Sequence, residues 1–347
     1  MYRKLRDLKW KPPAEWPKIS SMDMHTGGEP LRILTGGYPE IKGETILQKR
    51  KYFRENLDHI RRGIIWEPRG HADMYGAVVT GPSTPDGDFG TFFLHNEGYS
   101  TMCGHAIIAL TKFVLDTRMI RKRGDTPTLQ IDAPPGRIVS TGYRENGIVR
   151  SVSFRNVPSF VLQRDQTVQV PGLGRVKYDV AFGGAFYAVV DAEKFGLSLE
   201  GYEYARLIDL GTRIKKSVMN NQRITHPFEE ELSFLYGTIF TGRPFHNDRH
   251  SRNVCVFANG ELDRSSTGSG VSARAALLHA RGELRMGEKI SIESILGTSM
   301  DVEIAGITTF GPHKAVIPVV SGSASFTGRS KFWFDPEDPL RDGFMIR

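Results

Sequence analysis

Apolar residues recur at helical spacing in two separate parts of the chain. Within each set they lie three, four or seven positions apart, the spacing that places side chains on one face of an amphipathic helix. The first set comprises Ile46, Phe53, Leu57, Ile60 and Ile64, and the second comprises Leu207, Leu210, Ile214 and Val218. The pattern therefore predicts a helical segment in each half of the chain.

Short apolar runs that are typical of strands follow each predicted helical segment. They lie at 76–80 and 91–95 in the first half, and at 234–240 and 253–257 in the second. A short helix is then expected after Cys103 in the first half and after Thr267 in the second, because small and apolar residues follow a glycine-containing turn. The order of predicted elements is thus the same in both halves.

A repeated motif supports a duplication. Asp23 begins a D-x-x-x-G-G sequence, and Asp179 begins a second one. Each double glycine indicates a tight bend where the backbone approaches another group closely. Alignment of Cys103 with Thr267 also produces matches at a constant offset, namely Phe93 with Phe257, Glu97 with Glu261, Gly104 with Gly268 and Ala109 with Ala273.

These regularities predict an α+β fold of two pseudo-symmetric domains, each with strands wrapped around a central helix. Prolines and glycines interrupt the pattern near the middle of the chain, so we place the domains at 1–165, with Cys103, and at 166–324, with Thr267. The pattern leaves open whether the C-terminal tail, about 325–347, packs back onto the first domain. The two central helices are expected to begin on opposite sides of a cleft, a common location for small-molecule sites.

Composition narrows the class of protein. The 347 residues are 39% hydrophobic and 24% charged, which suits a globular protein with a large core. The net charge of +7 is scattered and comes without a nucleic-acid-binding motif, so we expect it to attract small carboxylates at most. Two cysteines do not form a disulfide framework, and neither a signal peptide nor an 18-residue apolar run is visible. A cytoplasmic location, with no membrane or nucleic-acid partner, is therefore expected.

The two predicted helix starts carry the candidate chemistry. The unpaired backbone N–H groups of a helix start bind anions, and two facing starts, at Gly104 and Gly268, could hold one carboxylate between them. A helix N-terminus also lowers a thiol pKa, so Cys103 is a candidate general base. The alternative interpretation is that Cys103 is a small buried hydrophobic residue.

Several neighbouring residues have both a functional and a structural interpretation. His105 is interpreted either as a second acid or base, or as a buried histidine satisfied by hydrogen bonds. Asp263 is interpreted either as the partner of a substrate cation, or as part of a solvated turn. Tyr75 and Phe257 occupy apolar runs in which aromatic residues ordinarily form the core. Cys255, in the run Asn-Val-Cys-Val-Phe, is interpreted as core packing. Metal-ligand, phosphate-loop and dinucleotide motifs are not found, so no metal or cofactor is expected.

Five motifs resemble those of the proline racemase and hydroxyproline epimerase family. They occur in family order between about residue 20 and about residue 330. The motifs are Asp23-Met-His-Thr-Gly-Gly-Glu-Pro30, Pro68-Arg-Gly-His-Ala-Asp-Met-Tyr-Gly76, Met102-Cys-Gly-His105, Asp179-Val-Ala-Phe-Gly-Gly184 and Asp263-Arg-Ser-Ser-Thr-Gly-Ser-Gly270. The resemblance implies a fold of the diaminopimelate epimerase type and a homodimer.

One departure from the family pattern changes the activity that the resemblance implies. The racemases use two cysteines, one on each face of the substrate Cα, whereas here Thr267 stands in the second position and Ser266 replaces a proline. A threonine hydroxyl is a poor proton donor to a carbanion. The resemblance therefore implies cofactor-independent dehydration of trans-3-hydroxy-L-proline to pyrroline-2-carboxylate, with Cys103 as the base. Epimerisation of a hydroxyproline, or binding of an amino acid without turnover, are the alternatives.

The resemblance also implies roles for the substrate-binding residues. They form a carboxylate cradle, a partner for the ring nitrogen and two aromatic walls. Racemases tend to have phenylalanine where Tyr75 stands, so we expect the phenol to contact the substrate 3-hydroxyl. The residues are Gly104, His105, Gly268 and Ser269 in the cradle, Asp263 at the nitrogen, and Tyr75 and Phe257 at the walls.

Overall fold

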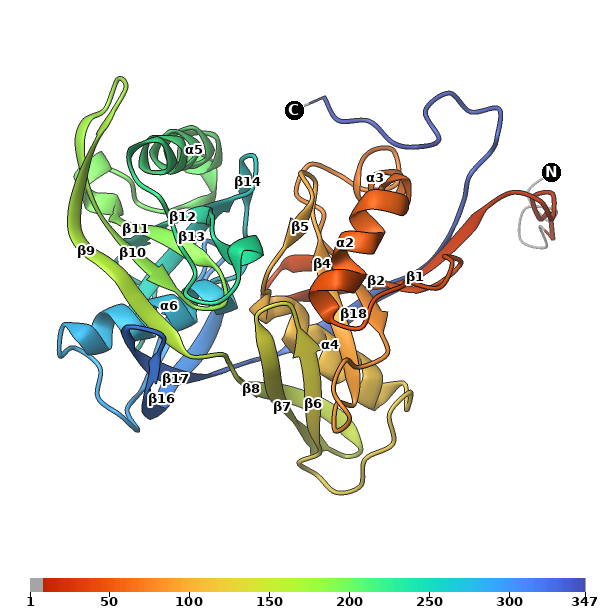
Figure 1. Ribbon diagram of the computed structural model, residues 1–347, viewed down its shortest axis with the longest axis horizontal. Helices are drawn as coiled ribbons and strands as arrows, with labels where there is room; N and C mark the ends of the chain where they lie inside the picture. The colour runs from red at the N-terminus through yellow and green to blue at the C-terminus, as the bar shows by residue number, and fades with distance from the viewer. Residues whose placement is uncertain (1–8, 347) are drawn as a thin grey trace.

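The computed structural model describes residues 9–346 and shows two lobes side by side (Figure 1). Most of the basic N-terminal leader, residues 1–8, lies outside the described residues. Each lobe consists of twisted strands packed around one buried helix, which confirms the predicted α+β fold. None of the helices within residues 9–346 is long and apolar enough to cross a membrane.

The first lobe surrounds helix α4 (Gly104–Asp116), which is buried from Gly104 to Leu115. Its apolar side chains meet β1, β2, β7 and β8, so the helix is enclosed by the sheet and not merely laid on it. Outside this sheet lie α2 (Ile46–Asn56) and α3 (Asp58–Ile65). The strands are β1 (Lys18–Thr26), β2 (Glu29–Gly36), β3 (Gly76–Thr80), β4 (Phe89–Leu94), β5 (Tyr99–Ser100), β6 (Thr128–Ala133), β7 (Gly136–Glu145) and β8 (Ile148–Arg155).

The second lobe surrounds helix α6 (Gly268–Ala280), which is buried from Gly268 to Leu278. Helix α5 (Tyr204–Asn221) covers the outside of the sheet with its apolar face, and three short 3-10 helices lie in the loops. The strands are β9 (Ser159–Val170), β10 (Gly174–Phe182), β11 (Phe186–Asp191), β12 (Leu235–Gly242), β13 (Ser251–Phe257), β14 (Glu261–Leu262), β15 (Lys289–Glu293), β16 (Ser299–Phe310) and β17 (His313–Gly322).

Two strand pairings join the lobes. Strand β17 pairs antiparallel with β8 across the boundary, with Val320 opposite Phe154. Strand β18 (Ala324–Trp333) then crosses to the first lobe and pairs along the whole of β1 (Figure 1). The C-terminal segment thus completes the sheet of the first lobe. The chain passes between lobes at 156–158, and the division into domains at residue 165 stays a proposal.

The sequence repeat corresponds to equivalent elements. Helices α4 and α6 both have 13 residues, with Cys103 and Thr267 as their N-caps. The two D-x-x-x-G-G motifs form the hairpins between β1 and β2 and between β10 and β11. One detail differs from the predicted pattern: the helical segment from 46 to 64 is broken at Leu57, whose backbone leaves the helical conformation between α2 and α3.

Candidate active site

The two central helices meet end to end at a pair of glycines. A Cβ atom at Gly104 would lie 2.6 Å from the Cα of Gly268, and one at Gly268 would lie 2.8 Å from the Cα of Gly104. Real Cβ atoms do not approach backbone that closely, so only glycine allows this contact. As a result, the N-caps Cys103 and Thr267 face the same small space.

All nine residues selected from the sequence line one cavity between the lobes. The free space inside it is about 10 Å³, which admits at most about one water molecule. Met102, Tyr187 and Tyr236 line it as well. The nine are Tyr75, Cys103, Gly104, His105, Phe257, Asp263, Thr267, Gly268 and Ser269.

The Cys103 thiol is 5% exposed, and its sulfur lies 3.0 Å from Nδ1 of His105. Burial raises the pKa of this thiol well above its ordinary value, and the negative charge of Asp263 raises it further. The backbone N–H of Ala106 acts in the opposite direction, as expected at a helix start, but is outweighed. The prediction of a lowered thiol pKa is therefore wrong for this closed site, because desolvation exceeds the effect of the helix terminus.

His105 is equally buried. Burial lowers its pKa, although Asp263 and a hydrogen bond to the Pro30 carbonyl act in the other direction. The imidazole is consequently neutral at pH 7, and it can accept the thiol proton of Cys103 in a hydrogen bond.

Asp263 and Thr267 form a closed hydrogen-bond arrangement at the start of α6. The Thr267 hydroxyl donates to Oδ2 of Asp263 at 2.8 Å, and the backbone N–H and hydroxyl of Ser265 donate to Oδ1 at 2.7 and 2.8 Å. Thr267 has a left-handed backbone with φ of 65°, which is unusual for a β-branched residue. This strained conformation is held by the surrounding bonds and fixes where the hydroxyl points.

Two carboxylates of the first lobe hold the loop that carries Asp263. The backbone N–H of Leu262 and the guanidinium of Arg264 donate to Asp73, at 3.2 and 2.8 Å, and the backbone N–H of Arg264 donates to Glu29 at 2.7 Å. Both residues that flank Asp263 are thus bound across the lobe boundary. Burial, and secondarily Asp263, raise the pKa of Glu29 well above its ordinary value. These contacts explain acidic positions in two motifs to which the sequence alone assigned no role.

Three tyrosines line the cavity, and two were missed from the sequence. The hydroxyl of Tyr75 shares a short hydrogen bond with Ser100, and the hydroxyl of Tyr187 is 2.7 Å from that of Ser269. Tyr187 in β11 and Tyr236 in β12 lie within apolar strand runs, where nothing local distinguishes them from core residues. Only the three-dimensional arrangement brings them to the cavity.

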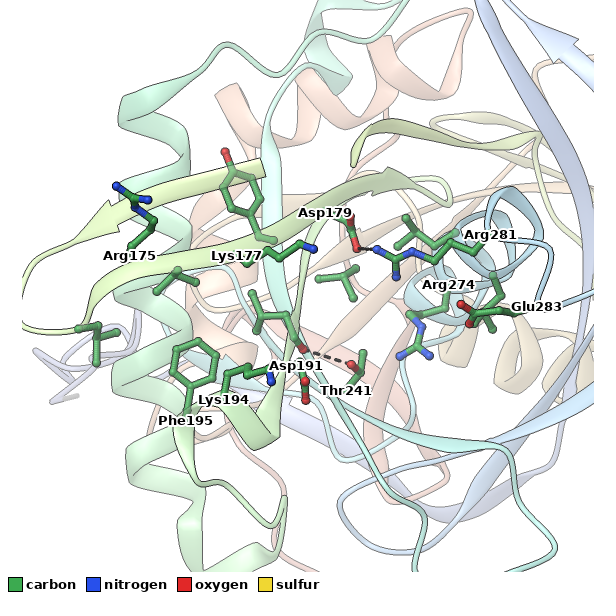
Figure 2. Close-up of a pocket in the computed structure, with 17 residues that line it drawn as sticks. Arg175, Lys177, Asp179, Asp191, Lys194, Phe195, Thr241, Arg274, Arg281 and Glu283 are labelled. Atoms are coloured by element: carbon green, nitrogen blue, oxygen red, sulfur yellow. Dashed lines mark hydrogen bonds and ion pairs between the residues drawn. The ribbon is translucent and has the colours of Figure 1, made fainter. Parts of the chain in front are cut away.

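A larger cavity, of about 620 Å³, lies elsewhere in the second lobe (Figure 2). It is bounded by β10, β11 and the C-terminal end of α6, and none of the nine residues lines it. Its charges are partly paired, as in the 2.7 Å contact between Arg281 and Asp179. Size alone therefore does not identify the site. In the described part of the chain, no group of three or more His, Cys, Asp or Glu side chains is placed to hold a metal ion.

Comparison with known proteins gives consistent results. The family model described as proline racemase matches residues 21–345. The chain is 48% identical over 342 residues to a trans-3-hydroxy-L-proline dehydratase of Colwellia psychrerythraea, covering 98% of this chain and 96% of the relative. It is 44% identical over 337 residues to a human protein of the same name, covering 95% of each. A hydroxyproline epimerase structure from Agrobacterium vitis, with bound trans-4-hydroxy-L-proline, superposes with a TM-score of 0.89 at 27% identity, covering 98% of this chain and 97% of that one.

Proposed function

Because the chain belongs to the proline racemase family, we propose that it catalyses the dehydration of trans-3-hydroxy-L-proline to pyrroline-2-carboxylate and water, without a cofactor. The names of its relatives support this activity. The observation that carries the proposal is that Thr267, a hydroxyl and not a thiol, faces Cys103 across one cavity. A homodimer in the cytoplasm is part of the same proposal.

The substrate is held by its two charges. Its carboxylate binds between the backbone N–H groups at the start of α4, Gly104 and His105, and those at the start of α6, Gly268 and Ser269. Its ring ammonium pairs with Asp263, a charge-assisted contact. The rings of Tyr75 and Phe257, 6.0 Å apart, form the aromatic walls. The cavity is too small for a proline ring as it stands, so it must widen to admit the substrate.

Substrate binding activates the base. The charge of Asp263 raises the pKa of the Cys103 thiol in the free enzyme. Once a ring ammonium neutralises that carboxylate, this contribution disappears and the thiolate is easier to form. The thiolate then removes the α-proton, while the N–H groups around the carboxylate stabilise the negative charge that develops there.

Thr267 determines what happens to the carbanion. Its hydroxyl is a weak acid and already donates to Asp263, so it delivers no proton to the face opposite Cys103. Inversion is therefore blocked. A substrate with a hydroxyl on Cβ can react by elimination instead, since the carbanion at Cα can expel that hydroxyl.

The test is to incubate the purified protein with trans-3-hydroxy-L-proline in the absence of cofactors. The cyclic imine is trapped by borohydride reduction and detected as proline by mass spectrometry. The proposal predicts stoichiometric imine. Saturable binding of the amino acid without imine would instead identify a catalytically silent binding protein, and would refute the proposed activity.

A further inference from the structure

One of the three tyrosine hydroxyls in the cavity, that of Tyr236, lies close to another phenol, Tyr75, but within hydrogen-bonding distance of none of the described polar groups. Among the described residues, the hydroxyls of Tyr75 and Tyr187 bond to serines, whereas that of Tyr236 is left unsatisfied. Tyr236 is 5% exposed, so bulk solvent does not reach its hydroxyl. A buried hydroxyl without a partner is costly, by about 1–3 kcal/mol, and is rare in folded proteins. Its presence in a substrate cavity indicates that the substrate provides the partner.

Neighbouring rings fix the position of this hydroxyl. Tyr236 stacks on Phe257 with centroids 5.4 Å apart, and its edge contacts Tyr187 at 5.9 Å and His95 at 5.9 Å. The phenol is therefore held rigidly, as a catalytic group must be.

The Tyr236 hydroxyl and the Cys103 thiol line the same cavity, and the Tyr75 hydroxyl is close to both. Cys103 and Tyr75 of the first lobe and Tyr236 of the second lobe are thus neighbouring polar groups, with Tyr75 between the other two. Thr267 and Asp263 belong to the opposite helix start.

The stereochemistry of the substrate matches this arrangement. In trans-3-hydroxy-L-proline the 3-hydroxyl is opposite the carboxylate, and the α-hydrogen is also opposite the carboxylate. The α-hydrogen and the leaving hydroxyl therefore share one face of the ring. A base at Cys103 requires that the leaving hydroxyl points toward the side of the cavity where the thiol and its neighbour Tyr75 lie, and Tyr236 is the next phenol beyond Tyr75.

We propose that Tyr236 is the catalytic acid that protonates the leaving hydroxyl, an assignment that rests on the proposed function. The Cα–H bond breaks and its proton passes to the Cys103 sulfur, while the Cα–Cβ double bond forms. The Cβ–O bond breaks and its oxygen takes the Tyr236 proton, leaving as water. The phenolate of Tyr236 then recovers a proton from the Cys103 thiol through the Tyr75 hydroxyl, which restores the thiolate.

The electrostatic surroundings are consistent with this role. Burial raises the pKa of Tyr236 well above its ordinary value, and the neighbouring phenols Tyr75 and Tyr187 raise it further. Tyr236 is therefore protonated throughout the neutral range and holds the proton that departing hydroxide needs. The Tyr75 hydroxyl, expected from the sequence to contact the substrate 3-hydroxyl, is already bonded to Ser100, so we assign it as the link between sulfur and phenol and assign the contact with the leaving hydroxyl to Tyr236.

The test compares Tyr236→Phe with the unaltered enzyme on two substrates. With trans-3-hydroxy-L-proline we expect kcat to fall about 10²-fold or more, the usual contribution of a positioned acid, with KM changed by less than about threefold. With trans-3-fluoro-L-proline we expect a loss of less than about fivefold, because fluoride leaves without a proton. Tyr178→Phe, a buried tyrosine that lines the remote cavity, is the matched control and should behave as the unaltered enzyme on both.

Each other outcome overturns the assignment. Equal losses on both substrates would make Tyr236 a positioning residue, and an unchanged kcat would exclude it from the reaction. Turnover of the fluoro substrate also shows that the variant is folded, and removal of an unsatisfied hydroxyl is not expected to lower its melting temperature. If the unaltered enzyme itself forms no imine, the proposed function fails and not merely the role of Tyr236.

Discussion

Replacing Cys103 with serine exchanges sulfur for oxygen at the atom that we propose removes the α-proton. The pKa of an alcohol lies far above that of a thiol, so at neutral pH the variant holds almost no charged base. Positioned acid–base groups contribute about 10²–10⁴-fold to rate, and we expect kcat for dehydration to fall by at least about 10²-fold. The fold should survive, because the new hydroxyl keeps a buried acceptor, Nδ1 of His105, 3.0 Å from the present sulfur.

The expected stability change follows from that contact. A net hydrogen bond contributes about 1 kcal/mol, which corresponds to a change in melting temperature of roughly 3 °C or less for a chain of this size. The assay measures imine by borohydride trapping, alongside a thermal melt. Tyr178→Phe is the control, since Tyr178 is buried and lines the remote cavity and not this one. Dehydration by Cys103→Ser at the unaltered rate would refute the assignment of the base.

Three further predictions concern the same site. Thr267→Cys should epimerise trans-4-hydroxy-L-proline to an extent measurable by chiral chromatography, because a second thiol can then deliver a proton to the opposite face. A folded, imine-forming variant without this gain would contradict the role of Thr267. Gly104→Ala places a Cβ atom 2.6 Å from the Cα of Gly268 and should lower kcat/KM about 10²-fold. Gly36→Ala, whose Cβ atom would have no neighbour within 4 Å, should leave kcat/KM unchanged. Equal activities of the two variants would show that the helix ends need not touch. In pH–rate profiles, kcat/KM should rise with pH, because burial and Asp263 raise the pKa of the Cys103 thiol in the free enzyme. The acidic limb of kcat should lie at lower pH than that of kcat/KM, because the bound ammonium neutralises Asp263. A kcat limb at higher pH would contradict this order.

Much of the fold could be predicted because the duplication left the same pattern in both halves. An apolar run located β3 at 76–80, and glycine-containing turns located the starts of both buried helices. The alignment of Cys103 with Thr267 corresponds to two equivalent N-caps. The break at Leu57 could not be predicted, because the apolar face continues across it. The pairing of β18 with β1 depends on residues about 300 positions apart, which no local pattern records.

The site could be predicted where chemistry is local and not where it depends on packing. Cys103 and Asp263 stand in glycine-containing turns at helix starts, where a motif is visible. Tyr187 and Tyr236 resemble any aromatic residue in a buried strand, and Asp73 acquires its role only through contact with the other lobe. The raised pKa of Cys103 is likewise a property of the closed cavity, because the sequence shows the helix start but not the depth of burial.

The most direct measurement of the central claim uses trans-4-hydroxy-L-proline, which fits the family site but has no hydroxyl on Cβ to expel. The unaltered enzyme and substrate are incubated in D₂O and followed by proton NMR and chiral chromatography. With one sulfur at Cys103 and a hydroxyl at Thr267, no cis-4-hydroxy-D-proline should accumulate, while trans-3-hydroxy-L-proline in a parallel sample is converted to imine. Accumulation of the D-epimer at a rate comparable to imine formation would contradict the account.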